Sequence, residues 1–218
     1  MSEKAPFVIA LDGPAASGKS SVGLGVARAL GLGYFDTGLL YRALTWLALQ
    51  RSVPSTDSEG LRYLIEELRV EVDPIGRVYR DGIDITEGLH QSDVSAAVSA
   101  VSAHAGVREA MRPAQRALIR APGLVMAGRD IGTVIVPDAS LKIWLHASAE
   151  ERARRRAAQT GEVYAAVLAA MQRRDELDAS RAVAPMLRAA DAVTVETDGV
   201  ALSDVIADIV RLARQRGA

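Results

Sequence analysis

A glycine-rich segment near the start of the chain has residue types and spacing suited to binding a triphosphate. Gly13 to Ser20 reads G-P-A-A-S-G-K-S and fits the pattern G-x-x-x-x-G-K-[ST]. It follows the apolar run Phe7 to Leu11 and precedes a stretch of helical period that ends near Gly31. In such a loop the backbone N–H groups and the helix N-terminus attract phosphate oxygens. The predicted phosphate-binding residues are Gly13, Pro14, Ala15, Ala16, Ser17, Gly18, Lys19, Ser20 and Ser21.

Two side chains of this loop have chemistry of their own: Lys19 supplies a mobile cation, and the Ser20 hydroxyl is the expected Mg²⁺ ligand. The loop alone predicts a bound nucleoside triphosphate, because GTPases, motors, transporters and kinases share it. A regulatory GTPase would need a guanine-reading N-K-x-D segment, and neither Lys4 nor Lys142, the other lysines, lies in one. Motors and transport ATPases are ordinarily larger. A kinase of a small molecule using ATP remains.

The elements that must position the loop alternate between apolar runs and segments of helical period. Most of the runs are uninterrupted rather than alternating, as in parallel strands buried on both faces. They lie at 7–11, 33–35, 124–127, 141–145 and 193–195, and the helical segments at 20–30, 39–49, 107–119 and 202–212. This order predicts an α/β fold of the P-loop kinase type, with a five-stranded parallel sheet flanked by helices.

Two stretches interrupt the alternation. Short strands at 70–72, 77–80 and 83–85, the last two joined by Asp81-Gly82, predict a small inserted antiparallel β subdomain. Ser148 and Glu151 form a capping-box pattern at the start of an arginine-rich helix, which we expect to be a short lid. The predicted division is a core with the P-loop at 1–69, an insertion at 70–105, core at 106–148, a lid at 149–165 and core at 166–218.

Four later segments, 34–42, 127–134, 174–181 and 182–185, follow the loop in a characteristic order: YFDTGLLYR, AGRDIGTV, RDELDASR and AVAP. Together they closely resemble the bacterial cytidylate kinases, nucleoside monophosphate kinases of pyrimidine metabolism that phosphorylate CMP and dCMP. The resemblance runs from about Phe7 to Pro185 and, more weakly, through the last helix. It implies ATP as donor, CMP or dCMP as acceptor, Mg²⁺ as cofactor, and a CMP-binding role for the insertion at 70–105.

The resemblance also implies roles for individual residues. Thr37 would lie near the base or sugar, Ser99 near the cytosine, Asp130 at the cytosine amino edge and Asp178 on the ribose. Arginines would bind the phosphates: Arg42, Arg108, Arg129, Arg174 and Arg181 on the acceptor side, and Arg155, in the Arg152 to Arg156 cluster, on ATP. Lys19, Arg129 and Arg174 are the expected catalytic residues.

Some positions leave alternatives open. Asp36 could contact the substrate, cap the following helix or hold an Mg²⁺-bound water, and Asp130 could orient Arg129 as an ion-pair partner instead of contacting the substrate. The segment Gly88 to Ser92 reads GLHQS where many relatives carry an arginine, and the lid is of the short kind, unlike that of long-lid adenylate kinases.

Bulk composition is that of an ordinary globular protein with one core, 49% hydrophobic and 24% charged. A net charge of −1 argues against nucleic-acid binding, and the absence of cysteine excludes disulfides and thiolate metal sites. The three histidines lack metal-ligand spacing. No apolar run approaches the roughly 20 residues that a membrane span needs. We expect a cytoplasmic monomer with no membrane partner.

The chemistry expected of a phosphate acceptor is electrostatic. Because the second pKa of a phosphate monoester is about 6, the acceptor is already ionised at neutral pH and needs no general base. Two polyanions must be aligned and neutralised, which suits Mg²⁺, Lys19 and the arginines. One alternative is another acceptor, such as UMP or shikimate; the hydroxyl of shikimate would need a general base, for which Asp36 is the candidate. The other alternative is a switch that binds ATP without phosphoryl transfer.

Overall fold

The computed structural model describes residues 5–73 and 76–218, which form two compact units. The first unit contains the chain up to Phe35 and from Ile119 to Ala218, and the second contains Asp36–Leu118. Each is treated separately below. Among the residues described, no helix combines the length and apolar character that crossing a bilayer requires.

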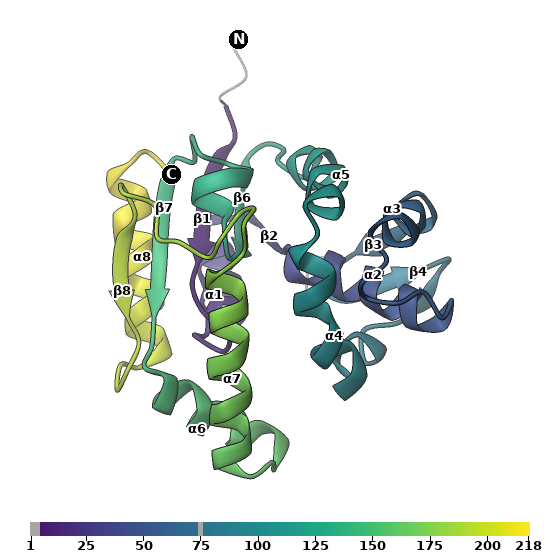
Figure 1. Cartoon of the computed structure of the whole chain (residues 1–218). Helices are drawn as coiled ribbons and strands as arrows, with labels where there is room; N and C mark the ends of the chain where they lie inside the picture. The colour runs from purple at the N-terminus through teal and green to yellow at the C-terminus, as the bar shows by residue number, and fades with distance from the viewer. Residues whose placement is uncertain (1–4, 74–75) are drawn as a thin grey trace. The chain divides into compact units, whose positions relative to one another are not determined.

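A five-stranded sheet organises the first unit (Figure 1). Its order is β2-β6-β1-β7-β8, with pairs β1·β6, β1·β7 and β7·β8 parallel. The central strand β1 and its neighbour β6 are buried along their whole length, as the uninterrupted apolar runs predict. The P-loop follows the carboxyl end of β1. The strands are β1 Phe7–Asp12, β2 Gly33–Asp36, β6 Gly123–Gly128, β7 Leu141–His146 and β8 Val193–Glu196.

Helices cover this sheet through an apolar core. Val22 and Val26 of α1 and Val205 and Ile209 of α8 pack in one cluster with Ile9 of β1. The helices α6 and α7 lie side by side as a hairpin (Figure 1), held by a small cluster around Ala153. The helical elements are α1 Lys19–Leu30, α6 Ala149–Thr160, α7 Tyr164–Ala179, α8 Leu202–Gln215 and one turn of π-helix, Ile131–Ile135.

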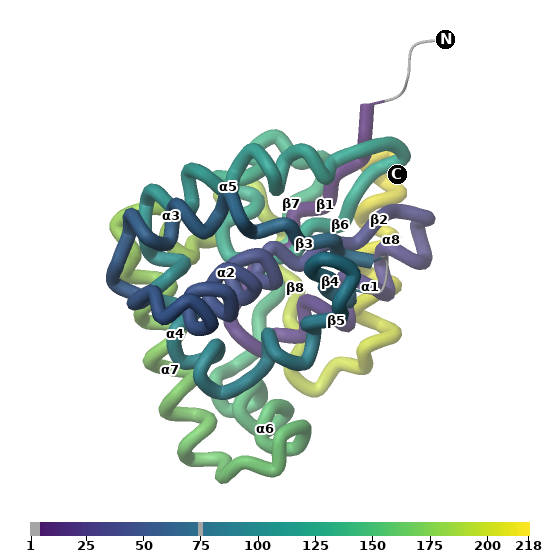
Figure 2. The backbone as a smooth tube through the Cα atoms, turned by 90° about the vertical axis from the view of Figure 1, so that its right-hand side faces the viewer, coloured from purple at the N-terminus to yellow at the C-terminus, as the bar shows by residue number. Residues whose placement is uncertain are grey.

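The second unit has a helical core of its own. Leu44 and Leu47 of α2 pack with Leu61 of α3, Val101 of α4 and Met111 of α5. Figure 2 shows α2 beside α4 in this unit. Its elements are α2 Gly38–Gln50, α3 Ser58–Glu67, α4 Ser92–Ala103, α5 Ala105–Ala117, one 3₁₀ turn at Gly88–His90 and three short strands.

The three short strands form the predicted antiparallel sheet. β3 (Val70–Val72), β4 (Val78–Arg80) and β5 (Ile83–Asp84) pair in the order β3-β4-β5. Asp81 and Gly82 both have positive φ, 51° and 78°, as the two central residues of a type I′ hairpin require. The sheet lies in a unit that begins before and ends after the predicted insertion 70–105, so the expected functional division of the chain stays a prediction.

Candidate active site

The P-loop has a backbone that only small residues permit. A Cβ atom on Gly13, whose φ is 155°, would lie 2.3 Å from the carbonyl oxygen of Leu145 on the neighbouring strand. Gly18 adopts a left-handed conformation as the N-cap of α1, with φ of 92°. Glycine avoids the strain that a side chain would meet at both positions. The loop therefore stays close to the sheet and turns directly into the helix.

Lys19 lies against the loop that precedes it. Its side chain is buried, and Nζ donates to the carbonyl oxygens of Gly13 at 2.9 Å and Pro14 at 2.7 Å. The first turn of α1 carries no acidic residue. Positive charge from the lysine and from the helix N-terminus is thus concentrated where an anion would bind.

Ser20 fits the predicted role in holding Mg²⁺. It lies exposed in the first turn of α1, directly after Lys19. The described residues contain no cluster of three or more acidic, His or Cys side chains able to enclose a metal ion. Mg²⁺ in phosphoryl-transfer sites is held by one or two protein ligands, substrate phosphates and waters, so a single hydroxyl beside the loop suits it.

Arg129 connects the loop to an aspartate on α7. Its Nη1 donates to the carbonyl oxygen of Gly13 at 2.7 Å, and its Nε donates to Asp178 Oδ2 at 2.9 Å. Arg181 pairs with the other oxygen of Asp178. The structure therefore brings Arg129, Asp178 and Arg181, three of the predicted residues, into one cluster that touches the P-loop.

The charges of this cluster control the ionisation of Asp178. Burial by itself would raise the pKa of this carboxyl, but the neighbouring charges of Arg129 and Arg181, with a smaller effect from Arg174, hold the pKa below its ordinary value. Asp178 is an anion at neutral pH. It orients the two guanidinium groups, and their remaining N–H donors suit phosphate oxygens.

Asp12 is a site residue that the sequence analysis missed. This last residue of β1 is 5% exposed, and its two oxygens accept from the backbone N–H groups of Ile131 and Gly132, each at 2.8 Å. Burial raises the pKa of Asp12 to about 6 although both hydrogen bonds lower it. The one available signal was its place directly before Gly13.

A second missed contact lies at Ala15 in the middle of the P-loop. Arg152 of α6 donates from Nη1 to the Ala15 carbonyl oxygen at 3.0 Å, and Asp175 of α7 accepts from the Ala15 N–H at 3.4 Å. Arg152 and Asp175 also form an ion pair at 2.7 Å. Arg152 is 5% exposed, whereas a helix with four arginines in five positions suggests mainly solvated side chains.

Arg155, the arginine expected to reach ATP, lies in other contacts. Its Nε pairs with Glu151 at 3.0 Å, and its Nη1 and Nη2 donate to Oγ1 and O of Thr197 at 3.0 Å and 2.5 Å. Its ATP-binding role stays a prediction. One of the two hydrogen bonds of the predicted capping box is present at the start of this helix: Ser148 Oγ accepts from the Glu151 N–H at 3.2 Å.

In the second unit, Arg108 is buried beside an aromatic ring. Its guanidinium carbon lies 5.4 Å from the centre of the Tyr41 ring, a cation–π arrangement, and Nη1 donates to the Ser102 carbonyl oxygen at 3.1 Å. Ser102 in turn donates from Oγ to the carbonyl oxygen of Ser99 at 3.2 Å. Two predicted substrate residues, Ser99 and Arg108, are thereby linked within one unit.

Arg42 reaches the segment where an arginine is missing. Its Nη1 donates to the Leu89 carbonyl oxygen at 2.8 Å and to Ser95 Oγ at 3.1 Å. Thr37 is buried at the start of α2, and Asp36 Oδ1 accepts from the Gly38 N–H at 2.9 Å. This contact lies one residue before the N-cap of α2, Thr37, and the capping, substrate-contact and water-mediated Mg²⁺ roles of Asp36 all stay predictions.

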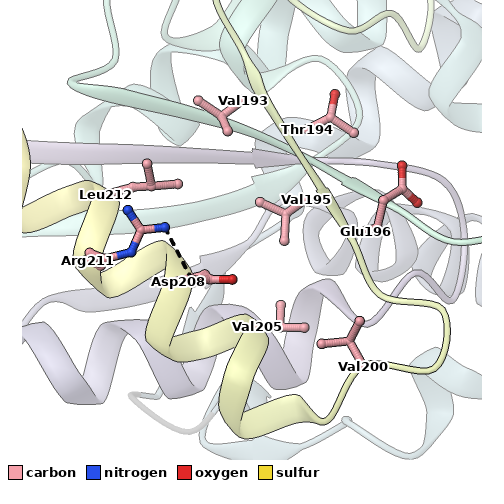
Figure 3. Close-up of a pocket in the computed structure, with 9 residues that line it drawn as sticks. All are labelled: Val193, Thr194, Val195, Glu196, Val200, Val205, Asp208, Arg211 and Leu212. Carbon is pink, nitrogen blue, oxygen red and sulfur yellow. Dashed lines mark hydrogen bonds and ion pairs between the residues drawn. The ribbon is translucent and has the colours of Figure 1, made fainter.

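A separate groove of about 360 Å³ lies between β8 and α8 (Figure 3). Valine side chains of the edge strand face apolar side chains of the helix, and Asp208 pairs with Arg211 at 3.2 Å along its wall. No predicted site residue lines it. The predicted residues instead divide between the units: the P-loop, Arg129, Asp130, Arg155, Arg174, Asp178 and Arg181 belong to the first, and Thr37, Arg42, Ser99 and Arg108 to the second.

A phosphate-binding loop after the central strand of a five-stranded parallel sheet, with buried arginines around it, defines the P-loop kinase class. One solved structure with this fold is TT1252 from Thermus thermophilus, 20% identical with a TM-score of 0.51, covering 99% of this chain and 100% of that one. The family model of cytidylate kinase matches residues 9–215. The chain belongs to the cytidylate kinase family.

Curated relatives agree over nearly the whole chain. The cytidylate kinase of Enterococcus faecalis is 43% identical, covering 96% of both chains, and that of Mycobacterium avium is 45% identical, covering 97% of both. A bifunctional pantoate ligase/cytidylate kinase of Synechococcus sp. is 43% identical over 96% of this chain, which spans 44% of that longer protein.

Proposed function

We propose that this protein transfers the γ-phosphoryl group of ATP to CMP or dCMP, giving ADP and CDP or dCDP. One observation carries the proposal: the carbonyl oxygen of Gly13 accepts from both Lys19 and Arg129. The cation of the donor loop and the arginine of the Asp178 cluster therefore meet at one atom. Family membership supports CMP as the acceptor.

On the donor side, the loop supplies inward-facing N–H groups and the cation of Lys19 for the phosphates of ATP. Ser20 would hold Mg²⁺, which would supply positive charge to neutralise the phosphates of ATP. The carbonyl contacts of Lys19 keep the ammonium beside the loop until phosphate oxygens replace them.

On the acceptor side, we assign phosphate binding to the arginines that the family resemblance implies. Asp178 would accept from the ribose hydroxyls and keep Arg129 and Arg181 oriented. Arg42 and Arg108 would bind the monophosphate, with Thr37 and Ser99 near the nucleoside. No general base is assigned, because the acceptor phosphate is already ionised. Catalysis then consists of alignment and charge neutralisation.

A kinase with an alcohol acceptor would need a carboxylate base. The candidate, Asp36, accepts from the Gly38 N–H. Asp178 is paired to two arginines, and this pairing lowers its proton affinity. These contacts favour a phosphate acceptor over a hydroxyl. The proposal also retains the expectation, taken from composition, of a cytoplasmic monomer.

The test is a panel of acceptors at fixed ATP and Mg²⁺, with ADP release as the readout. CMP and dCMP should stimulate ADP release far more than UMP, AMP, GMP or shikimate. Product identity should be checked by chromatography, since CDP must appear in equal amount to ADP. If no nucleoside monophosphate stimulates ADP release, the proposal is wrong: release with shikimate would then indicate an alcohol kinase, and no release with any acceptor would favour an ATP-binding switch.

A further inference from the structure

Asp12 occupies the junction between the central strand and the P-loop. Its backbone pairs with Gly128 of β6, and its carboxylate accepts from the N–H groups of Ile131 and Gly132. The segment from Gly128 to Gly132 therefore wraps around one buried carboxylate. Two charge-assisted hydrogen bonds at 2.8 Å hold consecutive peptide groups, which leaves this turn little freedom to rotate.

Arg129 lies inside the segment that Asp12 holds. After it, the Asp130 carbonyl oxygen accepts from the N–H groups of Val134 and Ile135, which closes the π-helical turn. Before it, β6 is fixed in the sheet. The backbone on both sides of Arg129 is thus anchored, so the guanidinium leaves the turn in one direction, toward Gly13 and Asp178.

Consecutive residues of the loop entrance contact the same turn from two sides. The side chain of Asp12 binds its N–H groups, and the carbonyl oxygen of Gly13 accepts from Arg129. The fit is close, since a Cβ atom on Gly132 would lie 3.1 Å from the Lys142 side chain and 3.4 Å from Asp12 Oδ2. A shift of Asp12 would therefore move the turn and Arg129 together.

We propose that Asp12 is a positioning residue for phosphoryl transfer, which acts by holding the 129–132 turn so that Arg129 points at the phosphate-binding loop. This inference rests on the proposed function. Burying a carboxylate is unfavourable, as its raised pKa shows. A residue that is needed only to join two segments would not require that charge, whereas a carboxylate accepts from both N–H groups at once, one with each oxygen.

The rival explanation is a purely structural contact between β1 and the 129–132 turn. A double-mutant cycle separates the two explanations, because a purely structural contact predicts that the effect of Asp12→Asn on kcat is the same with and without Arg129. Asp12→Asn keeps the side-chain shape but places an NH₂ group opposite one of the two N–H donors. We expect kcat to fall by about 100-fold, because a small misplacement of the Arg129 guanidinium has an effect of this size. The KM for ATP should change less.

The cycle compares wild type, Asp12→Asn, Arg129→Ala and the double variant at saturating ATP and CMP. If Asp12 acts through Arg129, adding Asp12→Asn to Arg129→Ala lowers kcat by less than about twofold further. If the two effects multiply instead, the inference is wrong. Asp208→Asn, an exposed aspartate of α8 paired with Arg211, is the matched control and should leave kcat unchanged.

Folding is checked for each variant by circular dichroism and thermal unfolding. If Asp12→Asn does not fold, Gly132→Ala replaces it in the same cycle, because the added Cβ atom would lie 3.1 Å from the Lys142 side chain and should displace the 129–132 turn while the carboxylate stays. Little further loss of kcat when Gly132→Ala is added to Arg129→Ala supports the inference, and effects that multiply refute it. Wild-type turnover with CMP is measured first, so an inactive wild type refutes the proposed function, whereas an active wild type with multiplying effects refutes only the role of Asp12.

Discussion

The Nζ atom of Lys19 lies 2.7 Å from the carbonyl oxygen of Pro14, within the loop that should bind phosphate. A second contact, to Gly13 at 2.9 Å, completes the arrangement. The ammonium is thus held beside the loop by neutral acceptors, which are weaker partners for a cation than charged phosphate oxygens. We therefore expect the phosphates of ATP to displace these contacts when it binds.

Replacing Lys19 by alanine should lower kcat by on the order of 10³-fold, because a preorganised positive charge at the transferring phosphoryl group is lost. Circular dichroism should remain that of the wild type, since the hydrogen bonds that the ammonium donates to Gly13 and Pro14 join residues of the same loop. Arg211→Ala, at an exposed position of α8, is the control. Wild-type turnover in the Lys19 variant would overturn the role assigned to the loop.

Asp178→Asn should weaken monophosphate binding more than ATP binding. The amide removes the anion that orients Arg129 and Arg181 and weakens the acceptor proposed for the ribose. We expect the KM for CMP to rise by about tenfold and the KM for ATP by much less, as for loss of a charged hydrogen bond. Asp178→Ala should show a larger effect of the same kind. An unchanged KM for CMP in both variants would contradict the ribose assignment.

Arg152→Ala should raise the KM for ATP by about tenfold, because the variant loses the charged donor to the Ala15 carbonyl oxygen and leaves Asp175 without its ion-pair partner. The matched control is Arg154→Ala on the same helix, whose side chain is 68% exposed. Steady-state kinetics should show little change in that control. Equal effects of the two substitutions would mean that Ala15 does not depend on Arg152.

The stability of the protein should depend on pH through Asp12. Its pKa is about 6 in the folded protein against 3.8 ordinarily, so the folded state binds more protons between these values. The contribution of Asp12 therefore becomes less favourable as pH rises from about 4 to 6, by up to ~3 kcal/mol for a shift of about two units. Asp130 and Lys19 act on this carboxyl, and the Lys142 stem lies nearby.

This pH effect is measured by urea unfolding of wild type and Asp12→Asn at several pH values between 4.5 and 7. The free energy of unfolding of the variant, relative to wild type, should increase over this interval. Other titrating groups cancel in the difference because both proteins share them. Parallel curves for the two proteins would show that Asp12 does not titrate in this range.

Much of the local structure could be predicted because it depends on residues close together in the chain. Uninterrupted apolar runs predict the buried parallel strands, and Asp81-Gly82 predicts the hairpin through the positive φ angles it permits. The P-loop pattern predicts the turn into α1, since glycine is required at fixed spacing. Ser148 predicts a helix start through its hydrogen bond three residues on.

The sequence by itself thus determined the strands, the helix starts and the phosphate-binding loop, through backbone preferences and hydrophobic periodicity. Only the tertiary structure decided that Asp12 holds a turn 119 residues away, that Arg152 contacts Ala15 across 137 residues, and that Arg155 turns to Thr197. The physical reason is that a long or charged side chain forms hydrogen bonds with whichever partners the folded chain places within reach. Arginines adjacent on one helix therefore differ in their partners according to which face of the helix is packed.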